Sequence, residues 1–517
     1  MEADKLSASS LEKDEEIMNE AESINYRLAE TKFMDLYCYF FKLTHLGAII
    51  SLSSMLQNIL DGIGIMLTTR TGGVPMQAAF GLYALMQFFI VNTTTGGVAE
   101  KISQSCSKSA GMHNHYLTKR NFAQGLLIFF TMYFLIMLPI MLSGKYYLSA
   151  FGYSETMTTM TMHVLHLMVP SAFIRRCSDM YFSFIISQDI EKPFLPISII
   201  NFCISIVLVL IMCWHFNYGF YGWLLGRYFF DLFNFFTYIY VYFKKVHPKA
   251  VGLPPVKFLF DGFGSYFADC FKYIVSLFLE WSGYEIFQLL VASTLDPAQI
   301  ATSSIFNNIN NLIFNVGSGF GSVGRVRINY LLGFRRPDAA KNVFISFTLG
   351  TVTSGIIVGV LLFMVNPWLI TLYAGNNPPV QYHLYGVILV MSLCSTLDQI
   401  STLTYTVARS LDLLRYSLAL NFIFIIAIQI GVGSFIVKYK PDIMLLLINM
   451  YTTYLCVYLV LLIVYFVYDW TKVDLHPEIT PKKKPGETDP LISRQRTLTK
   501  NDKLPEFLVR QDSKNVN

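Results

Sequence analysis

The sequence predicts an all-α polytopic membrane protein with about twelve transmembrane helices in two six-helix lobes. Its 517 residues are 54% hydrophobic and only 14% charged, with a mean hydropathy of +0.47, whereas soluble domains carry about 25% charged residues. The apolar residues recur in blocks of roughly 20, the length that a helix needs to cross about 30 Å of hydrocarbon. Each block must be helical because lipid offers no partner to backbone polar groups. An internal repeat groups the blocks into two lobes.

Twelve blocks of this kind follow one another along the chain, and each is a predicted span. The first lobe holds the spans near 46–67, 77–99, 123–142, 162–186, 193–212 and 221–243. The second lobe holds those near 273–295, 305–323, 343–365, 384–406, 417–437 and 443–468.

Two polar tails flank the spans. The chain divides into a tail at 1–43, a first lobe at 44–245, a second lobe at 246–470 that opens with a cytosolic loop, and a tail at 471–517. The N-terminal tail opens MEADKLSASSLEKDEE, which is not a signal peptide, and both tails have the composition of disordered segments. In the second tail, ETDPLI has the form of an acidic dileucine sorting signal. Its residues are Glu487, Leu491 and Ile492.

The loops predict the orientation, because cytoplasmic loops carry an excess of Lys and Arg. On one side, the loops after spans two, six and eight alone hold at least 13 of these residues, and all the loops on the other side together hold 4. The richer side has Lys101, Lys108, Lys119, Arg120, Lys244, Lys245, Lys249, Lys257, Arg325, Arg327, Arg335, Arg336 and Lys341. The poorer side has Arg70, Lys145, Lys438 and Lys440. Both termini are therefore predicted to be cytosolic.

Four pairs of similar positions recur at nearly one offset. The pairs are Asn92 and Asn315, Gly111 and Gly333, Asp179 and Asp398, and Asn201 and Asn421, and the offsets between their numbers are 223, 222, 219 and 220. An even number of spans between the copies returns the second lobe in the same orientation as the first. Secondary transporters commonly place the substrate between two such halves.

Three stretches resemble the multidrug and toxic compound extrusion (MATE) family of the MOP superfamily. FLEWSGYEIFQLLVAS (278–293) resembles the seventh-span signature E-W-x-x-Y-E of its eukaryotic members. GSGFGSVGRVRINYLLGFRRPDAAK (317–341) resembles the eighth-span segment, and VPSAFIRRCSDMYFSFIISQDIEKP (169–193) the fourth-span pattern P-x-x-F ending in Q-x-x-x-x-P. The sequence departs from the family at Ser282, at Asn308 in place of a carboxylate, and at Gly64 where bacterial members carry Asp.

Ionisable side chains inside spans need a partner or a function, because each costs roughly 2.5–3.5 kcal/mol in a membrane. Glu280, Glu285 and Asp398 have no Lys or Arg one turn away in their own spans, and they match carboxylate positions of MATE relatives, so they are candidate sites for substrate binding or ion coupling. Asp61, unpaired in the first span, is a candidate proton or sodium site of the first lobe. We read Arg227 with Asp231, and Arg175 and Arg176 with Asp179, as self-neutralised charges.

Further side chains are candidates for the lining of a substrate cavity, namely Trp281, Tyr284, Asn92 and Asn308. His163 and His166 lack a third ligand at metal spacing, and the eight cysteines are scattered without a CxxC pair, so no metal site is predicted. No Walker motif is present, and neither a catalytic residue nor a cofactor is expected beyond H⁺ or Na⁺ as the coupling ion.

Together these features favour a secondary antiporter that exports organic cations or xenobiotics in exchange for protons or Na⁺ as the two lobes rock. The alternatives are a lipid-linked glycan flippase of the same superfamily and a receptor-like or structural membrane protein that does not transport. The expected partners are small organic cations, the lipid bilayer and sorting adaptors at the C-terminal tail, with no nucleic acid, and the expected state is a monomer. The expected location is a vacuolar or endolysosomal membrane, or the plasma membrane.

Overall fold

The structure, a computed structural model, describes residues 46–64, 79–84, 86–150, 154–294, 296–374 and 377–473. The predicted N-terminal tail and residues 474–517 of the predicted C-terminal tail, which include the sorting signal at Glu487, Leu491 and Ile492, lie outside the described residues. Within the described ranges the chain forms helices joined by turns and bends, and it contains no strand.

The first lobe begins with the helix Leu46–Gly64. Residues 79–84 and 86–87 are helical and lead into η1 (Phe88–Asn92) and α3 (Thr93–Gly111). The remaining helices of this lobe are α4 (His115–Met132), η2 (Tyr133–Met137), α5 (Leu138–Leu142), α6 (Gly144–Ala150), α7 (Glu155–Ser187), α8 (Phe194–Leu210), η3 (Ile211–His215) and α9 (Phe220–Lys245).

The second lobe follows the short helices η4 (Pro248–Ala250) and α10 (Val256–Leu259). Its helices are α11 (Phe263–Ala292), α12 (Pro297–Gly333), α13 (Pro337–Ala374), α14 (Pro378–Ser410), α15 (Leu414–Asn421), η5 (Phe422–Ile428), α16 (Gln429–Tyr439), α17 (Ile443–Val467) and η6 (Trp470–Lys472).

Nine of the described helices are long and apolar enough to cross a membrane. Three more occupy the positions predicted for spans two, six and eight: η1 with α3, α9, and α12. These three are rich in Ser, Thr and Asn or carry ionisable side chains, and much of α3 and α9 is buried against other helices. Polar side chains are tolerated there because helices, rather than lipid, surround them.

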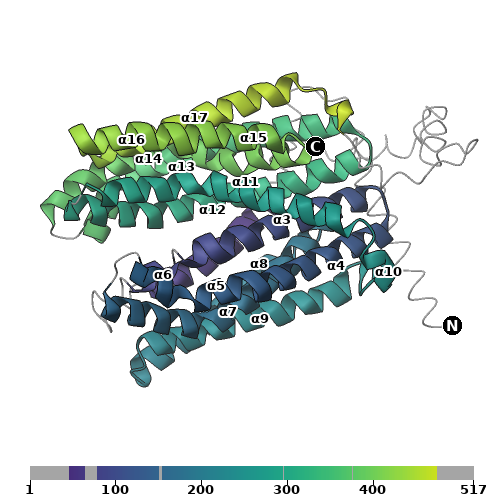
Figure 1. The fold of residues 1–517 in the computed structure, drawn as a ribbon, viewed down its shortest axis with the longest axis horizontal. Helices are drawn as coiled ribbons and strands as arrows, with labels where there is room; N and C mark the ends of the chain where they lie inside the picture. Colours follow the sequence, from purple (N-terminus) through teal and green to yellow (C-terminus); the bar gives the residue numbers. More distant parts are fainter. Residues whose placement is uncertain are drawn as a thin grey trace, which may run out of the picture. The chain divides into compact units, whose positions relative to one another are not determined.

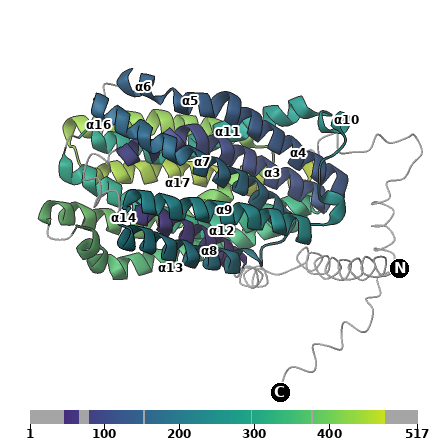
Figure 2. The same cartoon turned by 90° about the horizontal axis from the view of Figure 1, so that it is seen from below.

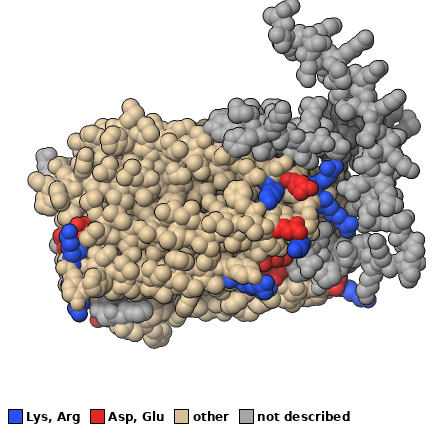
Figure 3. Space-filling model, turned by 90° about the horizontal axis from the view of Figure 1, so that it is seen from above, with Lys and Arg blue, Asp and Glu red and all other residues tan. Residues whose placement is uncertain are grey.

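The two halves of the chain form two groups of helices that lie side by side. In Figure 1 the first-lobe helices, coloured purple to teal, fill the lower half, and the green and yellow second-lobe helices fill the upper half. Figure 2 shows the same bundle with first-lobe helices such as α4, α7 and α9 across the view. On the face drawn in Figure 3, charged residues gather near the two ends, and a broad band between them shows none. That band suits contact with lipid.

The internal repeat is visible in the backbone. His113 and Arg335, related by an offset of 222, both have positive φ angles, of 52° and 59°, just beyond the ends of α3 and α12. Asp189 and Asp412, related by an offset of 223, have φ angles of 63° and 57° just beyond α7 and α14. Non-glycine residues rarely adopt this conformation. Its recurrence at nearly one offset shows that the two lobes are copies of one helical unit.

This register corrects one predicted equivalence. Helices α7 and α14 each have 33 residues, and their first and last residues are related by an offset of 223. The offset of 219 that paired Asp179 with Asp398 is therefore one helical turn too short, and the position equivalent to Asp398 is Arg175. An error of one turn keeps the same helix face, so the sequence pattern alone could not reveal it. Asn201 and Asn421 are each the eighth residue of their helices, α8 and α15, as predicted.

Candidate functional site

Each lobe holds a polar cluster built around its first and fourth spans, and the cluster is more exposed in the first lobe. In the first lobe, Asp61 forms ion pairs with Arg175 at 3.2 Å and with Arg227. Arg227 also pairs with Asp231 at 3.2 Å, the i,i+4 pair that the sequence predicts. The prediction that Asp61 is unpaired is wrong, because both of its partners come from other helices.

A neighbouring pair extends this cluster toward the second lobe. Arg176 pairs with Asp179 at 2.8 Å, as predicted, and also donates a 2.8 Å hydrogen bond to the side-chain oxygen of Asn92. Asn92 ends η1, whose Phe88 ring stacks on Trp281 of α11 with the ring centroids 5.6 Å apart. The first lobe thus places three guanidinium groups among three carboxylates, so its formal charges balance.

The second lobe makes the same contact with different chemistry. At an offset of 223, Asp61 and Arg175 correspond to Tyr284 and Asp398, and the Tyr284 hydroxyl donates a 2.8 Å hydrogen bond to Asp398. Tyr451 donates a second, 3.0 Å bond to the same carboxylate. Asp398 is 1% exposed, and no Lys or Arg pairs with it among the described residues. Where the first lobe has a balanced ion network, the second has a carboxylate among tyrosines.

Glu285 lies on a different face of α11 from its neighbour Tyr284. It follows Trp281 by one helical turn, so the two side chains share the face that contacts η1 of the first lobe. Glu285 is half-buried, and within the described part of the chain no hydrogen bond or ion pair is found for it. Trp281 also meets Phe314 of α12 edge to face, at 6.3 Å between ring centroids. An aromatic group in contact with the first lobe therefore lies one helical turn from an acidic group.

A polar stripe runs along α12. Its members recur at spacings of four and three, so they share one face of the helix. They are Ser304, Asn308, Asn311, Asn315, Ser318, Ser322 and Arg325. The first three are exposed, although they lie in or beside the predicted eighth span. Amides and hydroxyls on a transmembrane helix commonly face the bundle interior or water rather than lipid. Asn308 was predicted to line a substrate cavity.

An ion network joins the lobes at the end of the bundle where α3, α12 and α14 terminate. Glu100 of α3 pairs with Arg325 of α12 at 3.0 Å and with Arg409 of α14. Arg409 pairs with Glu280 of α11 as well. Glu280 indeed has no cationic partner in its own span, but the fold brings one from α14.

Two further ion pairs cross between the lobes at this end. Lys101 pairs with Asp269 at 2.9 Å, and Arg327 pairs with Asp189 at 2.7 Å. Lys101, Arg325 and Arg327, which the sequence assigned to loops, instead lie inside α3 and α12. The reason is that these helices continue past their apolar blocks. We call Glu100, Lys101, Asp189, Asp269, Arg325, Arg327 and Arg409 the interlobe lock.

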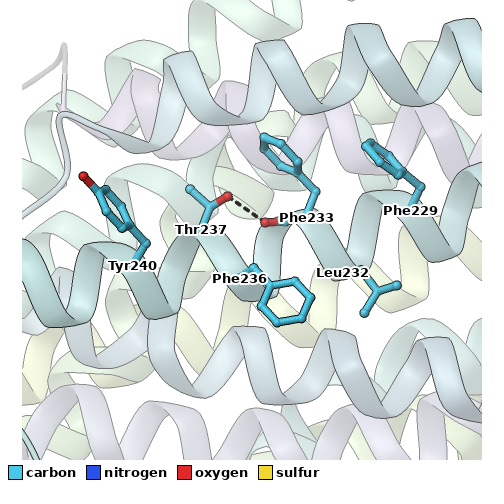
Figure 4. A pocket seen from close by; sticks show the side chains of 6 residues that line it. All are labelled: Phe229, Leu232, Phe233, Phe236, Thr237 and Tyr240. Atoms are coloured by element: carbon cyan, nitrogen blue, oxygen red, sulfur yellow. Dashed lines mark hydrogen bonds between the residues drawn. The ribbon is translucent and has the colours of Figure 1, made fainter.

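Other candidates give no site. Within the described ranges, no group of His, Cys, Asp and Glu has a metal-binding arrangement. His163 instead bonds to the Tyr221 hydroxyl at 3.1 Å. A hollow of about 480 Å³ lies along α9, lined by the side chains that Figure 4 labels. These are aromatic or aliphatic apart from Thr237, whose hydroxyl bonds to the Phe233 carbonyl, so we interpret the hollow as a surface for lipid.

Sequence reasoning missed Arg409, Glu100, Tyr451 and Asn311. Arg409 and Glu100 lie near the ends of apolar blocks, where a charge reads as the start of a loop, and they are far apart in the chain. The recurrence of Asn308, Asn311 and Asn315 at helical spacing was the one signal available in the sequence for the stripe.

Solved structures share this fold. The eukaryotic MATE transporter AtDTX14 has a TM-score of 0.72 and 18% identity, over 84% of this chain and 97% of that one. A mutant of the Vibrio cholerae MATE transporter VcmN has a TM-score of 0.72 and 13% identity, over 85% and 99%. A Pyrococcus furiosus MOP superfamily transporter, whose binding pocket is described as reversed in polarity, has a TM-score of 0.68 and 13% identity, over 83% and 95%. The search of curated protein sequences gives no match.

The family profile MatE matches the chain twice, at residues 50–211 and 273–435. The two matches fall on the two lobes, and their first positions are related by an offset of 223, in agreement with the repeat seen in the backbone. They cover well over half of the sequence, and the chain therefore belongs to the MatE family of membrane transporters.

Proposed function

We propose that the protein is a secondary active antiporter that exports organic cations in exchange for protons as its two lobes rock about the site between them. The asymmetry of the two polar clusters carries this proposal. The first-lobe carboxylates are each paired with an arginine, so a cation would have to displace a guanidinium to bind there. Asp398 and Glu285 have no such competitor among the described residues.

Cation recognition rests on Glu285 and Trp281. An organic cation between the lobes would gain Coulomb attraction from the Glu285 carboxylate and a cation–π contact worth about 0.5–2 kcal/mol from the indole ring. The stripe of amides on α12 would replace part of the water that such a cation loses. Tyr284 connects this region to Asp398 through its hydroxyl.

Asp398 is the proposed proton site. Its two partners are tyrosine hydroxyls, so adding a proton neutralises the cluster without stranding a cationic side chain. A neutral Asp398 attracts a nearby cation less than an ionised one does. Proton and substrate therefore compete, which is the requirement for exchange in opposite directions.

The alternative of a different substrate polarity has less support. The Pyrococcus furiosus neighbour is described as having a binding pocket of reversed polarity and a different function. In this chain Arg175, Arg176 and Arg227 all have aspartate partners, so an anionic group, such as that of a lipid-linked glycan, would face carboxylates already in place.

The orientation, membrane and oligomeric state of the transporter are proposed as well. We place both termini, and therefore the interlobe lock, on the cytosolic side of a vacuolar, endolysosomal or plasma membrane. The proposed active form is a monomer, and sorting adaptors would act on the C-terminal tail.

Transport by purified protein in lipid vesicles tests the function. An imposed pH gradient should drive movement of a fluorescent organic cation, with or without Na⁺. Asp398→Asn should abolish the response to the gradient, and Glu285→Gln should raise the cation concentration needed for half-maximal transport about tenfold or more. Glu155→Gln, an exposed residue in the first turn of α7, is the matched control. If the pH gradient still drives transport in the Asp398→Asn variant, the assignment of Asp398 as the coupling residue is wrong. If the unmodified chain shows no transport, a receptor-like role is favoured.

A further inference from the structure

One guanidinium serves both lobes. Arg409 extends one terminal nitrogen to Glu100 of the first lobe and the other to Glu280 of its own lobe, with Ser276 3.5 Å away. Its backbone carbonyl accepts hydrogen bonds from Gln104 at 2.8 Å and from Tyr273 at 3.3 Å. Arg409 is 4% exposed. The residue is thus fixed at both its side chain and its backbone, between two carboxylates that belong to different lobes.

Separation of the lobes affects these two carboxylates differently. Glu100 lies on α3 and moves away with the first lobe, whereas Glu280 lies on α11 and stays with Arg409. If Glu280 is ionised, Arg409 keeps a carboxylate partner after the lobes part. If Glu280 is neutral, parting strands a buried arginine, and an uncompensated buried charge is strongly unfavourable.

We propose that Glu280 controls the opening of the interlobe lock by acting as the alternative partner of Arg409. A neutral Glu280 keeps the lobes closed at this end, and an ionised Glu280 permits them to open. This role rests on the proposed antiport and extends it, since access from the cytosol then depends on an ionised Glu280 while Asp398 carries the exchanged proton. Arg409 is a positioning residue here, because it need not touch the substrate.

The neighbouring groups are consistent with this assignment. The charged and titratable side chains that face Arg409 or Glu280 are Glu100 from α3, Tyr273 from α11, Arg325 from α12, Tyr405 from α14, and Tyr454, Tyr458 and Tyr465 from α17. Tyr454 also donates a 2.7 Å hydrogen bond to the backbone carbonyl of Glu280. Within this set, Glu100 and Glu280 are the only carboxylates. No third acid of this set would compensate Arg409 once Glu100 has left.

The Glu280 region is also linked to the proposed proton site. The Tyr284 and Tyr454 rings lie 5.3 Å apart, and Tyr284 bonds to Asp398. Asp398 and Arg409 lie on the same helix, α14, with about 16 Å between them along its axis at the rise of an α-helix. A continuous helix therefore joins the proton site to the lock.

The test measures the distance between the lobes at this end by pulsed electron paramagnetic resonance. Spin labels are placed at Lys245→Cys and Arg415→Cys, both exposed and in different lobes, in the full chain with its eight native cysteines replaced by serine. Glu280→Gln should raise the ratio of closed to open molecules by about 5- to 150-fold, the usual range of allosteric coupling. In an Arg409→Gln background the same Glu280→Gln change should have no effect, since the shared guanidinium is gone. That double variant carries no unpaired charge at either position, so it avoids the most obvious route to misfolding.

Lys101→Gln provides the matched control. It removes another interlobe ion pair, with Asp269, but does not touch Arg409. Glu280→Gln should therefore shift the ratio by the same factor with or without Lys101→Gln. A shift that survives Arg409→Gln, or no shift in the single variant, would overturn the proposal.

These outcomes are separate from those of the transport assay. If the vesicles show no cation transport but the distances respond as described, the proposed substrate is wrong and the lock stands. If transport is coupled to protons but the distances do not depend on Arg409, the lock is wrong and the antiport stands.

Discussion

Asp61 and Asp398 take part in repeat-related contacts, but their loss should have different consequences. Asp61→Asn leaves Arg175 without its carboxylate partner and Arg227 with only one. We expect a loss of about 1–3 kcal/mol of unfolding free energy, below the roughly 3–5 kcal/mol of fully buried pairs, because a third of the Asp61 side chain is exposed. Asp398→Asn keeps an acceptor for a tyrosine hydroxyl and should change stability by less than about 1 kcal/mol.

Thermal unfolding of both variants in detergent measures the difference in unfolding free energy, and equal losses would contradict the prediction.

At this scale the sequence indicated candidate residues, because an ionisable side chain in an apolar block is conspicuous. Glu280, Glu285 and Asp398 were found in this way. Their partners were not, since Arg409 and Tyr451 come from other helices and only the fold brings them together.

Two glycines allow α3 and α12 to cross at the interlobe lock. A Cβ atom added to Gly111 would collide with the backbone oxygen of Tyr330, and one added to Gly333 with that of Lys108. These two contacts exchange under an offset of 222, so the crossing lies on the approximate twofold axis of the repeat. Gly111→Ala and Gly333→Ala should each force the helices apart and weaken closure by about 1–3 kcal/mol, as overpacking usually does.

Gly264→Ala in α11 is the matched control, because nothing lies within 4 Å of the added atom. The spin-label distance between the lobes should lengthen for Gly111→Ala and Gly333→Ala and stay constant for Gly264→Ala. If alanine at Gly111 and at Gly333 leaves the closed population unchanged, the helices adjust without separating and the prediction is wrong.

Helix positions were the easiest feature of the elements to predict, and helix ends the hardest. Hydropathy located spans near 77–99 and 305–323, whereas the helices there extend to Gly111 and Gly333. The extra turns are polar, so nothing in an apolar window marks them as helical. The lock is built from those turns, with Lys101 and Arg327 among its members, and this explains why it was read as loop charge.

At the scale of the whole molecule, the repeat made the two-lobe architecture predictable. The two lobes differ in the charge of equivalent residues, and the repeat alone does not reveal this difference. Equivalent positions hold Arg175 in one lobe and Asp398 in the other, so duplication conserved the contact and changed its charge. A sequence pattern that searches for similarity cannot find such a difference until the register is known from structure.

The orientation of the molecule follows from where its charges lie. The end that carries the interlobe lock also carries the basic loops, so the positive-inside rule predicts that this end faces the cytosol. Lys249 lies beyond α9 at this end, and Lys145 lies in α6 at the other end of the first-lobe helices; both are exposed. In a cysteine-free chain, Lys249→Cys should react with a membrane-impermeant thiol reagent once the plasma membrane is selectively permeabilised, and not before.

Lys145→Cys should react in intact cells if the protein is in the plasma membrane, and only after internal membranes are opened if it is vacuolar or endolysosomal. The pair therefore reports orientation and compartment together. Labelling of Lys249→Cys in intact cells would place the lock outside. The lock would then control access from outside, and a neutral Glu280 would keep the lobes closed on that side while the exchanged proton is released into the cytosol.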